Sequence, residues 1–379
     1  MISKRWFVAL LGLVLALAVA ACGDDDDEQA SASGSGGNSA PADVQRFVEK
    51  WEKKPTAINI DTPLEGEPAK GKKIVQLKCT VAECQEIYDG LKEAAEAVGW
   101  TAQDVNMGPT PEEVNQAFEQ ALTLNPDGIV ISGIPVAVFQ TYLDQAKQQG
   151  IPVVNISSVD KATGIDGNGL IATINGGWQT KLMGTLTGNF IVNDSGGQDA
   201  NVALVTVPDF PTLKPWVDET KSIIESKCDG CKATVVNAEV TDLGAKLPQT
   251  IVSTIQQDPE IDYVALAFSG AAVGVRPALN EAGFESVKIV GEGSNQEAME
   301  ALRNDEHQMW AALTTPMQGW YAVDAFLRFF NDEDVSDVAN GVPLPTQILT
   351  PETIKSIPEG PYDEPQDSAE QFKKLWGVQ

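Results

Sequence analysis

The sequence is poor in histidine, in basic residues and in long apolar runs, and each shortage excludes a class of protein. It contains one histidine, His307, and only 26 Lys and Arg residues against 54 Asp and Glu, which gives a formal net charge of −28. Such a charge repels nucleic acid and anionic lipid headgroups, so we expect neither as a partner of the surface. The sequence has no Gly-x-Ser-x-Gly motif and no metal-ligand spacing, and we expect His307 on a polar surface turn. We therefore predict that the chain is not an enzyme and that it carries neither a metal nor a cofactor.

The longest apolar run lies at the N-terminus and is too short for a transmembrane helix. It follows Lys4 and Arg5 and ends at Ala21, directly before Cys22. Its uninterrupted length is about 15 residues, whereas a membrane span needs roughly 20. A basic start, a short apolar segment and small residues at the end are typical of a secretory signal peptide, here residues 1–21.

The residues Val19–Cys22 resemble a bacterial lipobox. This resemblance implies that Cys22 is acylated, becomes the mature N-terminus and ties the protein to the outer side of the cell membrane. An ordinary signal peptide that ends near a cysteine is the alternative.

The other four cysteines form two close pairs, Cys79 with Cys84 and Cys228 with Cys231. Close pairs in an oxidising compartment favour disulfides. A four-cysteine metal site would require the two pairs to meet in space, and a redox Cys-x-x-Cys motif opens a helix after a strand. Cys228–Cys231 instead follows an expected helix and precedes an expected strand. We interpret both pairs as structural disulfides, with a metal site and a redox centre as the alternatives.

A low-complexity tract follows Cys22, with Asp24–Asp27 and then a stretch rich in Ser and Gly, and we expect it to be a flexible tether. From Lys72 onwards, short apolar runs alternate with amphipathic segments, and the chain outside the leader and tether is long enough for two domains. The expected strands are Ile74–Leu77, Gly128–Ser132, Pro152–Ile156, Leu170–Ile174, Asn201–Val207, Ala233–Val236, Tyr263–Phe268, Val287–Val290 and Trp310–Leu313. The expected helices include Ile87–Val98, Glu112–Leu124, Val136–Gln149, Gln179–Val192 and Leu213–Lys227. This alternation predicts βαβ units, parallel sheets covered on both faces and an α/β fold.

Two segments repeat one plan. Asn125–Gly133 and Asp258–Gly270 each pass from a proline break into a buried strand and then a Ser-Gly turn, and each is followed by a helix, a glycine and another strand. The repeat favours two Rossmann-like lobes of similar plan over one long sheet. The alternative is that any two βαβ units look alike.

The leader, the low-complexity tether and the two lobes together resemble the type 1 periplasmic-binding-protein-like receptors of bacterial ABC importers, in the ribose/galactose branch whose lobes are similar to the LacI-type core. The resemblance covers roughly residues 72–350. It is carried by Asn125–Ser132, Gln149–Ile156, Ala172–Trp178, Val287–Gly291 and Met309–Leu313. The opening Gly71–Cys84 is similar to a group of actinobacterial lipoproteins described as sugar importer receptors.

The resemblance implies two Rossmann-like lobes with parallel sheets joined by a hinge of three crossings, near Asn175–Gly177, Thr314–Pro316 and Gly341–Pro345. Residues 22–71 would then hold the acylated cysteine, the tether and a short helix over Asp43–Lys53. The N-terminal lobe would comprise residues 72–175 and 316–342, and the C-terminal lobe residues 176–315 and 343–350. A tail over residues 351–379 would pack Phe372, Leu375 and Trp376 onto a lobe.

The same resemblance places the ligand in the cleft between the lobes, but the residues that read sugar hydroxyls in the family are largely missing here. Its Asn-rich loop is Cys79–Cys84, its Asp-Arg pair is Ser157-Ser158, and its second-lobe Arg falls near Trp216. Simple pentoses and hexoses are therefore in doubt, and a small, mostly neutral, sugar-like molecule is expected. The candidate ligand-binding residues are Thr80, Ser132, Asn155, Ser157, Ser158, Trp178, Asp209, Phe210, Trp216, Phe268, Ser269, Glu292, Asn295 and Thr314. Core packing is the alternative for the four aromatic residues, and Trp178 and Trp216 could instead cover helix starts. We interpret Glu83 and Glu86 as charges that complement a helix dipole.

The expected function is that of a lipid-anchored, extracytoplasmic receptor of an ABC importer, and a monomer. Its expected partners are a small-molecule ligand, an ABC permease and the membrane through the Cys22 lipid, with no nucleic acid. The alternatives are a sensory receptor for a signalling partner and an importer receptor for an aromatic molecule or a nucleoside.

Overall fold

The computed structural model describes residues 39–379. The predicted signal peptide, Cys22 and most of the tether lie outside the described residues. The first element is α1 (Ala42–Trp51), an amphipathic helix that buries Val44 and Val48. Over the described part of the chain, no helix is both long enough and apolar enough to span a membrane.

The first sheet has five strands, all parallel, in the order β2-β1-β3-β4-β5. They are β1 (Lys73–Lys78), β2 (Thr101–Asn106), β3 (Gly128–Ser132), β4 (Val153–Ile156) and β5 (Leu170–Ile174). The helices between them are α2 (Ala82–Ala97), α3 (Pro111–Thr123) and α4 (Val136–Gln148). Every residue of β3, β4 and β5 is buried, as expected for parallel strands covered on both faces. We call this sheet and the helices packed on it the first lobe.

The second sheet repeats this order, β7-β6-β8-β9-β10, and adds β11 antiparallel to β10. Its strands are β6 (Asn201–Thr206), β7 (Lys232–Asn237), β8 (Tyr263–Leu266), β9 (Lys288–Glu292), β10 (Met309–Leu313) and β11 (Thr346–Leu349). The helices along it are α5 (Gly177–Asp194), α6 (Lys214–Lys227), α7 (Leu247–Gln257), α8 (Val275–Glu281) and α9 (Gln296–Arg303). We call this part the second lobe. The fold is therefore α/β with two lobes of one plan, and the repeated segments of the sequence are the third strands, β3 and β8, of the two sheets.

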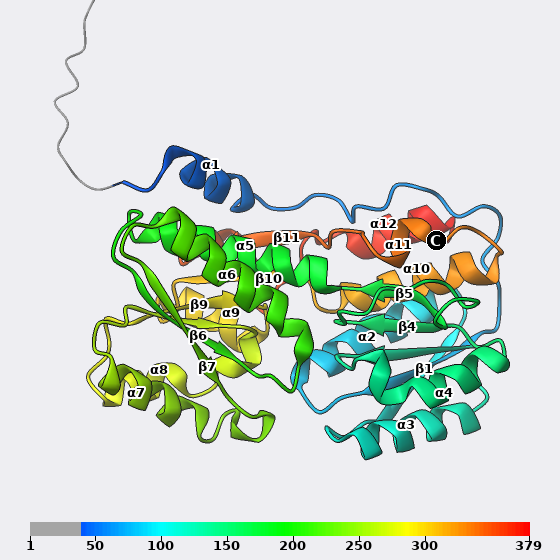
Figure 1. Ribbon diagram of the computed structural model, residues 1–379. Helices are drawn as coiled ribbons and strands as arrows, with labels where there is room; N and C mark the ends of the chain where they lie inside the picture. Colours follow the sequence, from blue (N-terminus) through cyan, green and yellow to red (C-terminus); the bar gives the residue numbers. More distant parts are fainter. Residues whose placement is uncertain (1–38) are drawn as a thin grey trace, which may run out of the picture. The chain divides into compact units, whose positions relative to one another are not determined.

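The chain passes between the sheets after β5, after β10 and before β11 (Figure 1). Between the second and third passages it forms α10 (Met317–Phe330) and α11 (Ser336–Ala339), which pack against α2 and β5 of the first lobe. The α2–α10 packing is close at Gly90 and Gly319. A Cβ at Gly90 would lie 2.0 Å from the carbonyl oxygen of Pro316, and one at Gly319 would lie 2.2 Å from the amide nitrogen of Leu91.

Segments at both ends of the described chain also connect the lobes. Helix α1 packs on α5 and β11, and the following residues run along the upper side of Figure 1 to the first lobe. After β11 the chain packs against α9 and then returns to the first lobe as α12 (Ser368–Trp376). There Phe372 and Trp376 stack on Trp320 of α10, with ring centroids 5.6 and 5.4 Å apart, so the tail packs on the first lobe.

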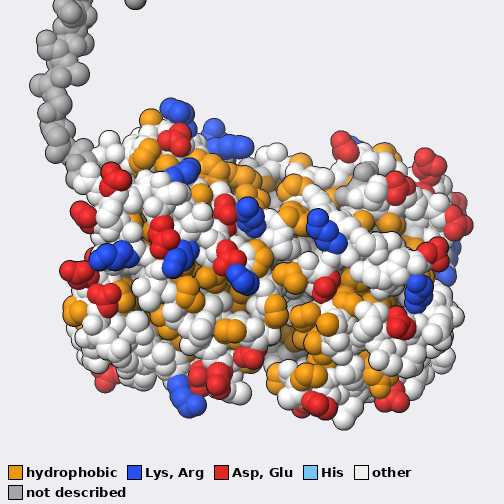
Figure 2. Space-filling model, in the orientation of Figure 1, with side chains coloured by type: hydrophobic (Ala, Val, Ile, Leu, Met, Phe, Trp, Pro, Cys, Tyr) orange, Lys and Arg blue, Asp and Glu red, His pale blue; other side chains and the backbone are white. Residues whose placement is uncertain are grey.

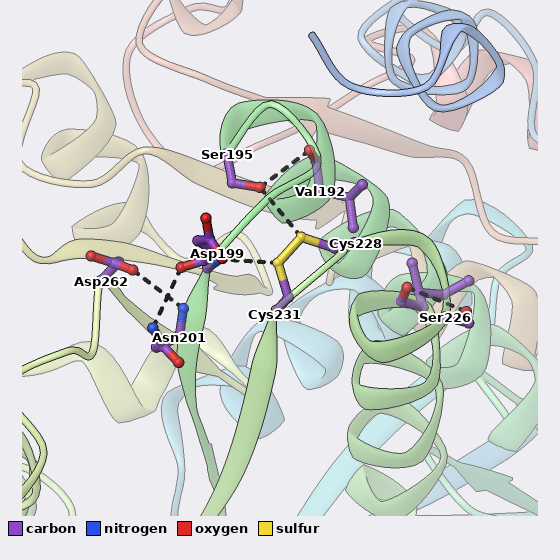
Figure 3. The surroundings of a disulfide bond; sticks show 10 residues. Val192, Ser195, Asp199, Asn201, Ser226, Cys228, Cys231 and Asp262 are labelled. Carbon is purple, nitrogen blue, oxygen red and sulfur yellow. Dashed lines mark hydrogen bonds between the residues drawn. A yellow bond between two sulfur atoms is a disulfide. The ribbon is translucent and has the colours of Figure 1, made fainter. Parts of the chain in front are cut away.

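Both cysteine pairs are joined as disulfides, Cys79–Cys84 and Cys228–Cys231. The second lies between the end of α6 and the start of β7 (Figure 3), where the sequence predicts it. The amide of Ala200 donates a hydrogen bond to the sulfur of Cys231, 3.0 Å away, which ties this turn to the start of β6.

The expectation for His307 is wrong. Its side chain is buried, and the indole Nε1 of Trp310 donates a hydrogen bond to its Nδ1 over 3.1 Å. Burial, with a smaller contribution from the charge of Arg276, lowers the pKa of His307 to about 4. The polar residues before it suggest a surface turn, but the histidine itself packs inward on β10.

Candidate functional site

A cavity of about 480 Å³ lies between the lobes at the carboxyl ends of their strands. Parallel sheets of this strand order bind ligands at that edge, where the order reverses between the first and third strands. The turn after β1 supplies Thr80, the last residue of β3 supplies Ser132, and the turns after β6 and β8 supply Phe210 and Ser269. In Figure 2 the surface is hollowed between the two halves at the lower edge of the view, with apolar side chains around the hollow.

The first lobe contributes the disulfide loop Cys79–Cys84 and the first turns of α2 to this cavity. The disulfide holds the loop over the end of β1, and α2 begins within it at Ala82. A second contribution comes from Met107–Thr110 after β2. Thr110 is fixed there by a capping box, because its hydroxyl accepts from the amide of Glu113 while the Glu113 carboxylate accepts from the Thr110 amide.

Three polar side chains, those of Asn175, Ser157 and Gln318, lie next to one another in the cavity lining, near the passages of the chain between the lobes. The side-chain amide of Asn175 donates to the hydroxyl of Ser157 at 3.0 Å, and that hydroxyl lies 3.5 Å from the amide oxygen of Gln318. Both Asn175 and Ser157 have left-handed backbone conformations, with φ of 51° and 54°. Such conformations are uncommon outside glycine and concentrate at functional sites.

The second lobe supplies an aromatic pair. The rings of Phe210 and Phe268 meet edge to face, with centroids 6.2 Å apart and an interplanar angle of 89°. Both rings are half-buried and line the cavity, together with Leu213 and Met183. This wall can bind the apolar face of a small organic molecule.

The charged side chains of the lining are Glu83 from the first lobe and Asp209, Glu239 and Glu292 from the second. Among the described residues that line the cavity, none is Lys, Arg or His. Burial raises the pKa of Glu292 well above its usual range. Beside the cavity, burial and the charge of Glu83 raise the pKa of Glu86 to about 7, against a hydrogen bond with Thr315 that lowers it.

Eight of the residues predicted from the sequence line this cavity. They are Thr80, Ser132, Ser157, Asp209, Phe210, Phe268, Ser269 and Glu292.

The structure places the other six predicted residues away from the cavity lining: Asn155, Ser158, Trp178, Trp216, Asn295 and Thr314. Trp216 is fully buried and donates from its indole to the hydroxyl of Thr187 at 3.2 Å, which is the core-packing alternative. The Asn155 amide donates to the carbonyl of Ile134, and Asn295 caps α9 by accepting from Ala298.

Two of the remaining three are also hydrogen-bonded within the fold. Ser158 pairs with Asp160, and the hydroxyl of Thr314 donates to the carbonyl of Glu364. Trp178 lies in the first turn of α5 beside Gly176, and its buried indole nitrogen has no hydrogen-bond partner among the described residues.

Several lining residues escape the sequence analysis. Glu83 reads as a helix-dipole charge, and Met107–Thr110 and Glu239–Thr241 follow the edge strands β2 and β7. Only Val105 is fully buried in β2, so this strand lacks the apolar run that marks the others. The signal that could find these loops is the strand order itself, since all carboxyl ends of a parallel sheet share one edge.

The described residues contain no cluster of three or more His, Cys, Asp or Glu side chains able to hold a metal ion.

A sequence family described as periplasmic binding protein domain matches residues 84–334, about two thirds of the chain. The chain belongs to this family. Its members are extracytoplasmic binding proteins that work with ABC permeases, and the two-lobed α/β fold of this binding protein is their type 1 fold. A search of curated proteins finds no sequence match.

Solved structures of low sequence identity share the fold of this binding protein. An ABC sugar transporter subunit from Rhodobacter sphaeroides 2.4.1 is 19% identical, with a TM-score of 0.63 over 75% of this chain and 99% of that one. A periplasmic ribose ABC transporter protein from Conexibacter woesei DSM 14684 is 16% identical, with a TM-score of 0.63 over 77% and 96%. A carbohydrate transporter from Acidothermus cellulolyticus 11B in complex with myo-inositol is 19% identical, with a TM-score of 0.62 over 76% and 96%.

Proposed function

We propose that this binding protein is a lipid-anchored, extracytoplasmic receptor that captures a small organic molecule between its lobes and presents it to an ABC permease. The observation that carries the proposal is the cavity, because the turns of both sheets line it at the edge where such folds bind ligands. A sugar or sugar-like molecule is the default cargo of the family. The protein would act as a monomer, and it would carry out no catalysis.

The lobe boundaries of this receptor are part of the proposal. The N-terminal lobe comprises residues 72–175 and 316–342, and the C-terminal lobe residues 176–315 and 343–350. Ligand binding draws the lobes together through the crossings that join them, and the closed face is what a permease reads. The end segments that also connect the lobes then limit how far they separate.

The receptor function is tested by a thermal-shift screen of the full chain in detergent against sugars, polyols, nucleosides and small aromatic molecules. A ligand present at a hundredfold over its Kd stabilises the folded state by about 2.7 kcal/mol, which raises Tm by several degrees. A reproducible rise with one chemical class supports the receptor function. Silence across all classes would count against it.

The lipid anchor is tested separately by feeding cells an alkyne-tagged fatty acid and detecting the tag on the full chain. The wild-type protein should carry the label, and Cys22→Ser should not. Equal labelling of both proteins would overturn the anchor without affecting the ligand-binding proposal.

A further inference from the structure

Carboxylates from both lobes line the cavity, and the described lining contains no basic side chain that could neutralise their negative charge. Glu83 lies in the first turn of α2, and Glu292 ends β9 on the opposite lobe. The two approach one region of the cavity. The Glu83 carboxylate accepts a hydrogen bond from Ser269, and the backbone of Gly293, next to Glu292, packs directly against that serine.

Glu292 has fewer partners than Glu83, which accepts a hydrogen bond from Ser269. Its side chain is half-buried, and no hydrogen bond or ion pair to it occurs in the described part of the chain. A buried charge without a partner costs free energy, and proteins normally pair it or hydrogen-bond it. At a site built to bind a ligand, the missing partner is a group that the ligand supplies.

Hydroxyl groups in the same cavity also lack partners. The Oγ of Ser132 and the Oγ1 of Thr212 are buried without a hydrogen-bond partner among the described residues, and both residues line the cavity. Ser132 is only 3% exposed. Buried hydroxyls are rarely left unpaired, so these two mark positions where a ligand places polar groups.

The wall beside the carboxylates is aromatic and aliphatic. The rings of Phe210 and Phe268 meet edge to face. A Cβ at Gly270 would lie 2.9 Å from the ring of Phe268 and 3.3 Å from Oε1 of Glu83, so the ring and the carboxylate lie close to each other. Aromatic faces attract cations, and the attraction grows when water is excluded. Carboxylates beside aromatic rings are a combination suited to an ammonium or guanidinium group.

We infer that the ligand of this cavity is a small organic cation, an amine-bearing molecule with an apolar or sugar-like body, rather than a neutral sugar. The inference rests on the proposed receptor function and narrows its ligand class. Glu83 and Glu292 accept hydrogen bonds from the cationic group, and the Phe210–Phe268 wall holds the apolar part. A cation supplies the positive charge that keeps Glu292 ionised, whereas an anion finds no positive partner in the lining and a neutral sugar supplies no positive charge. The net charge of −28 further raises the local concentration of cations.

The test uses pairs of probes that differ in charge but little in shape. The pairs are 3,3-dimethylbutylamine with 3,3-dimethyl-1-butanol, 2-phenylethylamine with 2-phenylethanol, and D-glucosamine with D-glucose. The full chain is screened with each probe at millimolar concentration by thermal shift, and hits are measured by calorimetry. At least one cation should raise Tm while its neutral partner does not.

Two variants separate charge from shape. Glu292→Gln keeps the side-chain size and should weaken binding of the cationic probe by about ten- to a hundredfold, as expected for loss of a hydrogen bond to a charged group. Glu83→Gln should weaken it in the same direction. Glu281→Gln, on the exposed end of α8, removes the same charge from the second lobe outside the cavity and should leave binding unchanged.

The outcomes distinguish this inference from the receptor function. A neutral probe that binds as well as its cationic partner, or a cation whose affinity survives Glu292→Gln, overturns the inference and leaves the receptor function standing. Silence of all six probes also overturns it. The receptor function is also rejected only if the broader screen of sugars, polyols, nucleosides and aromatic molecules gives no rise in Tm either.

Discussion

The carboxylate of Glu83 accepts a hydrogen bond from the hydroxyl of Ser269 over 3.3 Å. The two residues are 186 positions apart in the chain and belong to different lobes, Glu83 to α2 and Ser269 to the turn after β8. The bond therefore joins the lobes inside the cavity that both of them line. At this length it is longer than the usual O–H···O hydrogen bond, so we regard it as a weak contact between the lobes.

Replacing this hydroxyl should loosen the contact between the lobes. We expect Ser269→Ala to lower the free energy of unfolding by about 1 kcal/mol, because a neighbouring carboxylate loses one partner but keeps access to water. It should also increase the radius of gyration of the ligand-free protein in small-angle X-ray scattering. Ser226→Ala, on the exposed face of α6, is the matched control and should change neither quantity. Unchanged scattering of Ser269→Ala would show that the hydrogen bond does not hold the lobes together.

The pKa of Glu86, raised to about 7, makes stability depend on pH with a definite sign. The folded protein binds the proton of this carboxyl more tightly than the unfolded chain does, so the free energy of unfolding falls as pH rises from the usual Glu pKa towards 7. Glu86→Gln removes this loss. It should stabilise the protein by about 2 kcal/mol above pH 7, after allowance for partial exposure, and by almost nothing near pH 4.

Urea unfolding of wild type and Glu86→Gln across that pH range measures the effect. Glu281→Gln again serves as control, since it removes an exposed carboxylate. A stabilisation by Glu86→Gln that is the same at pH 4 and above pH 7 would contradict the assignment of the effect to this carboxyl.

The disulfide Cys79–Cys84 closes a loop of the cavity wall, and its removal should affect binding more than stability. The loop is short, so the loop-entropy relation gives a contribution of only about 2 kcal/mol to the free energy of unfolding. We expect the double variant Cys79→Ser with Cys84→Ser to remain folded at room temperature and to lose most of the ligand-induced rise in Tm. The variant Cys228→Ser with Cys231→Ser, whose disulfide lies between α6 and β7 outside the cavity lining, should keep that rise. If both double variants lost the ligand-induced rise in Tm equally, the loss would come from reduced global stability and not from the cavity loop.

The strands that the sequence predicts are those with continuous apolar runs, such as Gly128–Ser132, and the repeat of this unit in Asp258–Gly270 correctly predicts the two-lobed plan. The missed strands are β2 and β11. Four of the six residues of β2 are exposed, and β11 begins with two polar residues, Thr346 and Gln347, so neither carries an apolar run of its own. These two segments are recognised as strands only by their pairing with β1 and β10, which the sequence alone does not report.

The same reasoning explains the candidate site. Residues at or directly after the ends of predicted strands, such as Ser132 and Ser269, reach the cavity because strand ends share one edge of a sheet. Thr314 directly follows a predicted strand and Trp216 lies in the predicted helix Leu213–Lys227, but their side chains turn into the protein to meet Glu364 and Thr187. The direction of a side chain depends on packing that sequence spacing does not report. The sequence predicts Glu83 as a charge at a helix start, yet it lines the cavity, because the second lobe lies opposite this end of α2.

A buried ion pair couples the C-terminal helix to the segment that follows α1, and breaking it should destabilise the protein more than any change in the cavity. Arg328 donates from Nε to the carboxylate of Asp324 at 2.8 Å and from Nη2 to the carbonyl of Thr62 at 2.7 Å. The indole of Trp376 donates to the same carboxylate at 2.8 Å. Asp324 and Arg328 are both buried, so removal of this carboxylate leaves the buried guanidinium with only the more distant carboxylate of Glu333, 3.8 Å from Nη1.

We expect Asp324→Ala to lower the free energy of unfolding by about 3–5 kcal/mol, the usual cost of breaking a buried pair from one side. Trp376→Phe, which keeps most of the stacking on Trp320 but loses one hydrogen bond, should cost about 1 kcal/mol. Glu352→Ala removes the exposed partner of Lys355 and should leave the stability nearly unchanged. Urea unfolding ranks the three variants. If Asp324→Ala were no more destabilising than Glu352→Ala, the ion pair would not hold the C-terminal helix and the N-terminal segment on the first lobe, and the packing of Trp376 and Phe372 alone would account for their attachment.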